Sequence, residues 1–401
     1  MARNRVIYQS EALYVSKNVN STTSGEHRQL QRVQNANYNF SIDRQDVNQF
    51  GQLARIDALV IKSPTVSLDF SYYPTDGFNE RALGFYVQTG SLGEGNFSSG
   101  QMGSSSGQNY FIVTTSEGSD LNYETSANAL SGKSIIGIGN GFLTNYTLDA
   151  SVGNLPTVKI TVEGLNMNSS LYEYQLTGSS LYGIGAKTPQ IDPTAGAVAT
   201  GTHLSEKVVL FPLPNTNTGS SIISALRPGD MILDFDTFGD AGASNATPMA
   251  NLDGDSNSLS SNAVHIQSAS LTLPLSRTPI ERLGSKFAFA RVVDFPVVAT
   301  LNISAVVNEN QSRNLAKMLD DSSERDITLR IKSPLDTTKD ALRYKFKGAR
   351  LKSESFSSSI GANKSVDLVF ETQIGGPNDT AHGIFVSGIG TSDVGVNTWG
   401  Y

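Results

Sequence analysis

The sequence contains no cysteine, a single tryptophan and only four histidines. Without cysteine the chain has no disulfide framework, no thiol nucleophile and no cysteine-based zinc or iron–sulfur site. Basic residues are outnumbered by acidic ones, 30 to 37, which gives a formal net charge of −7. A tight nucleic-acid binder needs clustered positive charge to release counterions from phosphates, so this balance argues against that function. It leaves open a surface past which nucleic acid moves without sticking.

Long hydrophobic runs are also missing. No stretch approaches the roughly 18 consecutive apolar residues that a membrane-spanning helix requires. Residues 1–9 are too short and too polar for the core of a signal peptide. Asn-x-Ser/Thr triplets, such as those at Asn39 and Asn145, are expected by chance in a chain this rich in Asn, Ser and Thr. We therefore expect a soluble protein that is synthesised in the cytoplasm.

The main pattern in the sequence is an alternation of apolar and polar residues. It is strict or nearly so in residues 66–72, 158–163, 299–304 and 366–371. Period-2 runs of β-branched and aromatic residues are typical of strands with one buried face, and the Gly, Asn, Ser and Pro clusters between them supply turns. Helical periodicity is weaker and is best in residues 308–319 and 76–87. The sequence predicts a mainly β fold with about one short helix in each half.

Two long segments are typical of loops. Gly and Ser dominate residues 91–108, and Ser, Asn, Asp, Ala and Gly dominate residues 239–261. Such compositions bury too little apolar area to offset the entropy lost on ordering. Loops of this length are uncommon in compact domains unless they serve an interaction or stay disordered. Ordering by a neighbouring subunit would explain why the chain keeps them.

An internal repeat is the most informative feature of the sequence. Residues 33–44 (VQNANYNFSIDR) parallel residues 266–277 (IQSASLTLPLSR), and the register continues without a gap to Gly51 and Gly284. Further matches pair residues 13–16 with 232–235, 64–68 with 296–301, 81–83 with 313–315, and 162–169 with 346–353. Alternating sequences align with one another easily, but chance does not readily produce the shared order of strand, Arg, Gly, Pro, strand and helix.

We therefore predict a tandem duplication that divides near residues 199–202. The first domain covers residues 1–200 and the second, related domain covers residues 201–401, each a β-sandwich or barrel of about 200 residues. That division fits the length of 401 residues, because single hydrophobic cores stop growing at about 250–300 residues.

No catalytic or metal-binding constellation emerges from the sequence. The four histidines lack the spacing of known metal motifs, so we expect structural or exposed roles for them. They are His27, His203, His265 and His382. Residues 253–257 (DGDSN) imitate the start of a calcium loop, but Ser258 and Val264 stand where an EF-hand needs Gly and Glu. Paired carboxylates occur at Asp320–Asp321 and at Asp234 and Asp236, as they do in any acidic protein.

Three glycine-containing segments match chemical motifs only in their letters. Residues 137–141 (GIGNG) and 183–188 (GIGAKT) resemble phosphate loops, and residues 103–107 (GSSSG) resemble a nucleophile elbow. Each lacks the strand–turn–helix context that such motifs need, so we expect turns or loops there. The sequence predicts a protein that is not an enzyme, with no catalytic residue, no cofactor and no metal.

One strand carries an unusual charge pattern. Arg343, Lys345 and Lys347 alternate with Tyr344 and Phe346, so a strand would put the three cations on one face and the aromatics on the other. Two interpretations are open. The cations form a solvated face that also discourages edge pairing, or they form ion pairs with an acidic neighbouring subunit. The acidic candidates for such pairs are Asp320, Asp321, Glu324 and Asp326.

Segments of both halves are similar to the major tail (tail tube) proteins of long-tailed bacteriophages. In the first half they are residues 141–147 (GFLTNYT), 152–158 (VGNLPTV) and 162–167 (VEGLNM). In the second half they are residues 277–284, 294–296 (DFP) and 347–356 (KGARLKSESF). The resemblance implies a β-sandwich or barrel core with one helix and long loops or arms. It also implies sheets that join between subunits into hexameric rings, which stack into a tube through which DNA passes.

A duplicated chain of this kind would form trimeric rings with pseudo-sixfold symmetry, because three chains supply six domains. The resemblance thus implies a virion protein whose partners are its own copies and other tail proteins, with no membrane and no specific DNA binding. Most tube subunits are shorter, so a tail terminator or a baseplate hub component is an alternative. A carbohydrate-binding or adhesin-like β module is another, although its only possible indole platform is Trp399. A β-rich hydrolase ranks last.

Overall fold

The fold was analysed in a computed structural model. It describes residues 11–16, 28–60, 65–88, 95–102, 107–114, 133–164, 166–172, 174–177, 180–183, 226, 231–236, 264–281, 283, 288, 290–307, 324–333, 340–357, 365–376 and 378–388. Strands dominate these residues, and the mainly β fold expected from the alternating pattern is confirmed. Two short helices accompany the strands, α1 (Phe78–Ala82) and α2 (Ser99–Met102).

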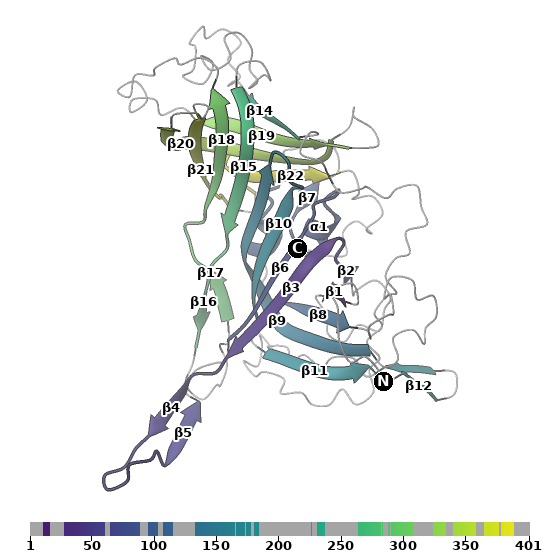
Figure 1. The fold of residues 1–401 in the computed structure, drawn as a ribbon, viewed down its shortest axis with the longest axis vertical. Helices are drawn as coiled ribbons and strands as arrows, with labels where there is room; N and C mark the ends of the chain where they lie inside the picture. Colours follow the sequence, from purple (N-terminus) through teal and green to yellow (C-terminus); the bar gives the residue numbers. More distant parts are fainter. Residues whose placement is uncertain are drawn as a thin grey trace.

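The strands are numbered in chain order and are drawn in Figure 1. They are β1 (Glu11–Ser16), β2 (Arg28–Gln29), β3 (Val33–Ser41), β4 (Arg44–Val47), β5 (Asp57–Val60), β6 (Thr65–Tyr72), β7 (Val87–Gln88), β8 (Gln108–Thr114), β9 (Lys133–Ser151), β10 (Thr157–Gly164), β11 (Asn166–Tyr172), β12 (Tyr174–Thr177), β13 (Ser180–Gly183), β14 (Met231–Asp236), β15 (Val264–Pro274), β16 (Arg277–Ile280), β17 (Ala290–Val293), β18 (Val298–Val307), β19 (Arg325–Lys332), β20 (Asp340–Ser357), β21 (Ser365–Gln373) and β22 (Gly383–Gly388).

A central antiparallel sheet, in the order β3-β6-β10-β9-β15-β18-β21-β20, forms the middle of the molecule. Its strands alternate as expected, and in β10 the side chains of Val158, Ile160 and Val162 are buried while those between them are not. The two longest strands, β9 and β20, each leave this sheet and continue into a second one. The first part of β9 pairs with β8 and β11, and the first part of β20 pairs with β19 and β22. Each half therefore has two layers that share one long strand.

The strands of the two halves follow the same spatial order. In the first half the order is β1-β8-β9-β10-β6-β3, and in the second it is β14-β19-β20-β21-β18-β15. A hairpin joins β3 to β6 in one half and β15 to β18 in the other. This order agrees with the matches of residues 13–16, 33–44 and 64–68 to their counterparts. The common origin of the two halves stays a prediction.

One of the expected repeat matches is wrong. Residues 162–169 lie at the end of β10 and in β11, whereas residues 346–353 lie within β20. In the spatial order of the strands, β20 of the second half is equivalent to β9 of the first half, and β21 is equivalent to β10. Alternating strands resemble one another locally, so sequence similarity alone misplaced them. The boundary at residues 199–202, the helix at 308–319 and the loop at 239–261 lie outside the described residues.

The two halves share one sheet rather than meeting only through side chains. Strand β15 pairs with β9 from Ser268–Ser151 to Pro274–Asn145. Near the other end of the chain, β22 pairs with β20 and also, in parallel, with β7 of the first half. Figure 1 shows β22 beside β7, and the cluster of buried hydrophobic residues includes side chains of both halves.

The first of the two expected loops, residues 91–108, needs a correction. Its described part includes α2, and Phe97 is fully buried with its ring stacked on Phe85 at a centroid distance of 4.2 Å. The Phe97 amide donates to the Ile384 carbonyl at 2.7 Å, and Asn96 Nδ2 donates to the His382 carbonyl at 3.3 Å. The chain's own second half therefore holds residues 96 and 97, which need no neighbouring subunit. The Gly/Ser composition concealed the anchoring role of one aromatic residue.

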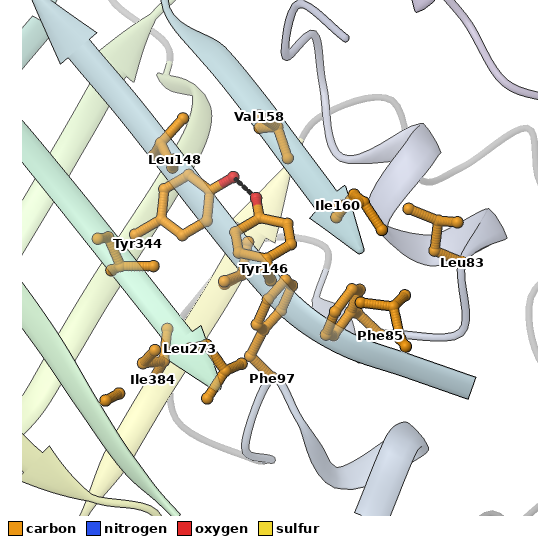
Figure 2. Packing of buried hydrophobic residues seen from close by; sticks show 14 of the residues in the cluster. Leu83, Phe85, Phe97, Tyr146, Leu148, Val158, Ile160, Leu273, Tyr344 and Ile384 are labelled. Carbon is orange, nitrogen blue, oxygen red and sulfur yellow. Dashed lines mark hydrogen bonds between the residues drawn. The ribbon is translucent and has the colours of Figure 1, made fainter. Parts of the chain in front are cut away.

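The core is continuous from one half to the other. Figure 2 shows Tyr146 of β9 beside Tyr344 of β20, with Phe85 and Phe97 packed nearby. The rings of Phe85 and Phe97 each meet Tyr146 edge to face, with ring centroids 5.2 Å apart. Burying one side chain of this size stabilises a fold by about 1.5–3 kcal/mol. Packing at this junction therefore adds to the strand pairing that joins the halves.

Candidate assembly surface

The central sheet ends in two open edges among the described residues. Strand β3 pairs only with β6, and residues 350–357 of β20 pair only with β21. An open edge presents backbone N–H and C=O groups that are ready to pair with another strand. These edges lie on opposite sides of one sheet, so an edge of one copy can extend the sheet of another.

Both edges also leave the hydrophobic layer incomplete. On β3, Tyr38 and Phe40 lie opposite the buried residues Leu68 and Val66 of β6 and face the core side of the sheet. The Phe40 side chain is nevertheless 54% exposed. On β20, Phe356 lies opposite the buried Val366, and it is 49% exposed. Apolar side chains thus continue the core face of the sheet onto both edge strands, where they are about half exposed.

The other face of the central sheet is polar but carries little net positive charge. Its residues are mainly Asn, Ser and Thr, such as Asn35, Asn37 and Asn39 of β3 and Ser268, Ser270 and Thr272 of β15. Two of its lysines are paired, Lys159 with Asp149 at 2.7 Å and Lys352 with Glu371 at 2.9 Å. Pairs this exposed contribute little stability, but they cancel charge that would otherwise attract phosphates.

Two hairpin arms extend from the sheet, one in each half. The first, residues 44–60, contains β4 and β5 and reaches away from the body at the lower left of Figure 1. Its tip residues Phe50 and Leu53 are fully exposed, with relative accessibilities of 105% and 110%. The second arm, residues 277–293, contains β16 and β17 and exposes Leu283 equally, at 102%. These tip residues of both arms are therefore apolar and fully exposed.

The second arm is fixed to the body by a buried arginine. Arg277 Nη1 donates to the Arg291 carbonyl at 3.3 Å, and Nη2 donates to the Gln101 carbonyl of α2. The guanidinium also lies 4.7 Å from the centre of the Phe142 ring. Burial, with a smaller effect of the Arg291 charge, lowers the pKa of Arg277 to about 10, so it remains protonated at neutral pH. Arg44, its counterpart in the sequence repeat, is exposed.

The lysines of the charged strand β20 make contacts within the same chain. Tyr344 and Phe346 of β20 are buried, as the alternation predicted. Lys345 Nζ lies 3.2 Å from Asp326, because β19 is the antiparallel neighbour of β20. Lys347 Nζ donates to the Thr380 carbonyl at 3.0 Å.

Asp326 and Glu324, two of the acidic candidates in the second of the two interpretations, have cationic partners within the chain. Both are partners within the chain, Asp326 of Lys345 and Glu324 of Arg350 at 2.9 Å. Strand pairing between β19 and β20 brings these charges together, which their distance along the sequence did not reveal. Asp320 and Asp321 lie outside the described residues.

The residues considered for chemistry do not come together. His382 Nδ1 lies 3.4 Å from Asp379 and its Nε2 lies 3.4 Å from Glu324, so the two carboxylates contact different nitrogens of the ring. His265 belongs to β15. Asp234 and Asp236 belong to β14. His27, His203 and residues 253–257, 184–188 and 103–106 lie outside the described residues. Within the described part of the chain, no three His, Asp or Glu side chains are grouped so that they could hold a metal ion.

The expected turn at residues 137–141 is wrong, because this segment is part of β9. A glycine is required at position 141 by close packing, since a Cβ there would lie 2.7 Å from Val162 Cγ1. Glycine in a strand often marks such a close approach.

Sequence reasoning missed the exposure of the arms. The repeat did contain a signal for them, since Phe50-Gly51 and Leu283-Gly284 stand at equivalent positions. Among the described helices, none is long and apolar enough to cross a membrane. No protein-family model matches the chain, and no curated protein matches it.

Proposed function

We propose that the protein is a virion structural protein that assembles into stacked rings and forms a bacteriophage tail tube, the conduit for DNA ejection. The observation that carries this proposal is the pair of open edges on one sheet, each with exposed aromatic side chains that continue the core layer. Synthesis in the host cytoplasm and incorporation into the virion follow from this function.

Ring formation joins unlike edges of neighbouring copies. The β20 edge of one chain pairs with the β3 edge of the next and covers Phe356, Tyr38 and Phe40. A contact between unlike surfaces repeats around an axis and closes into a ring when its rotation fits. Closure also removes the edges that would otherwise promote aggregation. Because each chain has two halves with the same strand order, three chains supply six repeats and give pseudo-sixfold symmetry.

The polar face of the central sheet is suited to line the bore. Its Asn, Ser and Thr side chains and its paired lysines offer phosphates no cluster of free positive charge. Counterion release therefore contributes little to DNA binding there. Asp69 and Asp367 are exposed on this face, and neither forms an ion pair with another described residue. DNA would pass such a wall without specific binding.

The hairpin arms are suited to join one ring to the next. Their exposed tip residues, Phe50 and Leu53 in one arm and Leu283 in the other, have no cover among the described residues. An apolar tip on a projecting ribbon buries its area when it meets a second copy. A tail terminator or baseplate hub would use the same edges but form single rings, and arms on both halves favour stacking.

Electron microscopy of the purified full-length protein, together with its mass in solution, tests the proposal. We expect rings or tubes of uniform bore and a ring mass of three chains. A protein that stays monomeric at high concentration would contradict the proposal. Single rings that never stack would support the terminator or hub instead.

One substitution tests the edge itself. We expect Phe40→Lys to abolish rings, because a charge within the new strand pair would be buried without a partner. The matched control is Val152→Lys, at an exposed apolar residue in the turn after β9, which should leave rings intact. Circular dichroism verifies that both variants are folded. Intact rings in the Phe40 variant would show that β3 is not the contact.

A further inference from the structure

The proposed function makes no use of Glu80, a fully buried carboxyl on α1. Glu80 Oε1 accepts hydrogen bonds from the Tyr72 hydroxyl at 2.9 Å and from the Tyr146 hydroxyl at 3.4 Å. The Tyr146 and Tyr344 hydroxyls share a further bond of 2.7 Å, drawn as a dashed line in Figure 2. Tyr72 and Tyr146 come from β6 and β9 of the first half, and Tyr344 comes from β20 of the second. One carboxyl and three phenols thus connect a helix to both halves.

The described residues around Glu80 include no cation paired with its carboxyl group. The titratable groups that face it are Tyr72 on β6, Tyr146 on β9, Tyr344 on β20 and Asp76 just before α1. Arg81, the next residue on the helix, donates instead to the Val87 carbonyl. Among the described residues no cation pairs with Glu80, and its Oε2 is buried without a hydrogen-bond partner.

We propose that Glu80 is a proton-operated latch between the two halves of the chain. The neutral carboxyl keeps the chain of phenols closed and dry. The carboxylate is a buried charge with no cation, which is strongly unfavourable, so ionisation favours an opened joint in which water reaches it. The opening separates Tyr146 from Tyr344 and loosens β9 from β20. This device does not depend on ring formation and can be tested whether or not the protein assembles.

The direction of the pH effect follows from the protonation of the two states. Burial raises the pKa of Glu80 to about 7 in the closed joint, although hydrogen bonds from its surroundings oppose the rise. In the opened joint the carboxyl returns to an ordinary value of about 4.5. Between these values the closed joint binds more protons, so it loses stability as the pH rises and changes little above 7. With these two pKa values, the opening constant grows about 70-fold from pH 5 to pH 8.

Hydrogen exchange of the full-length protein measures this opening directly. Exchange is followed from pH 5 to 8 at fixed protein concentration and corrected for its intrinsic pH dependence. We expect the opening constant to rise about 70-fold in peptides that contain Tyr146 and Tyr344. Peptides from β18, away from the joint, provide the internal reference. The Glu80→Gln variant keeps the shape of the side chain but cannot ionise, and its opening should change by less than about threefold.

The results separate the latch from a merely buried acid. An equal pH response in the wild type and in Glu80→Gln would overturn the proposal, as would opening at Tyr146 without opening at Tyr344. If Glu80→Gln does not fold, Tyr344→Phe provides the second test, because it removes the link to β20 and leaves Glu80 in place. In that variant we expect the response to persist around Tyr146 and to be lost around residue 344. Persistence at both sites would overturn the proposal.

Discussion

At the scale of single residues, Arg277 and Arg44 occupy equivalent positions of the sequence repeat but differ in burial. Both are arginines at the start of a hairpin arm, and the sequence alone treats them alike. Arg277 is buried, and its bond to Gln101 crosses 176 positions in the chain. Arg44 is exposed. Nothing in the residues near Arg277 reveals this difference, because it depends on where α2 packs.

We predict that Arg277→Lys lowers the free energy of unfolding by about 1–3 kcal/mol, because one ammonium group cannot reproduce two carbonyl contacts and stacking on Phe142. Arg44→Lys is the matched control and should change the free energy of unfolding by less than about 0.5 kcal/mol. Urea unfolding followed by circular dichroism measures both. Equal effects at the two positions would show that the buried contacts of Arg277 do not stabilise the second arm.

Residue burial was predictable where it followed the period of a strand. Tyr344 and Phe346 are buried because they alternate with cations, and this pattern is visible in the sequence. Glu80 was not predictable as a buried carboxyl. Its environment consists of phenols from three separate strands, the farthest of which is Tyr344, and only the fold brings them together.

At the scale of elements, both arms expose apolar side chains, but they differ in how many they expose. The first arm exposes Phe50 and Leu53 at its tip, whereas the second exposes Leu283. An ion pair between Arg55 and Asp46, at 2.8 Å, bridges the first arm, and Arg277 holds the second against the body. Among the described residues, the first arm therefore exposes the larger number of apolar side chains at its tip.

We predict that the double substitution Phe50→Ser and Leu53→Ser leaves rings intact and abolishes their stacking. The substituted side chains are fully exposed in the single chain, so its free energy of unfolding should change by less than about 0.5 kcal/mol. Leu283→Ser should weaken stacking less, because it removes a smaller apolar area. Tube length in electron micrographs at fixed protein concentration measures the effect. Tubes of normal length in the double variant would show that the first arm does not join rings.

Elements were predictable from sequence to the extent that local periodicity defines them. The strands at residues 66–72, 158–163, 299–304 and 366–371 are present. Residues 137–141 were misassigned to a turn because their glycines lack the side chains that mark a strand. The position of residues 95–102 depended on Phe97 reaching β22, a contact that no local pattern encodes.

At the scale of the whole molecule, the sheet does not stop at the expected domain boundary. Strand β15 of the second half continues the sheet of β9, and β22 of the second half pairs with β7 of the first. The repeat predicted two related halves, but it carried no information on how they meet. Pairing between distant strands depends on their register and edges, which a comparison of the halves with each other does not address.

Separating the halves therefore gives the last prediction. Residues 1–200 and 201–401, expressed alone, should each show β-type circular dichroism and poor solubility, because each exposes a strand edge that the other normally pairs. When mixed, they should rejoin as a one-to-one complex, since β9 regains β15 and Phe97 regains its contact with Ile384. Size-exclusion chromatography with mass detection measures the complex. A half without strand content would contradict the division near residue 200, whereas two folded halves that fail to rejoin would contradict the continuous sheet.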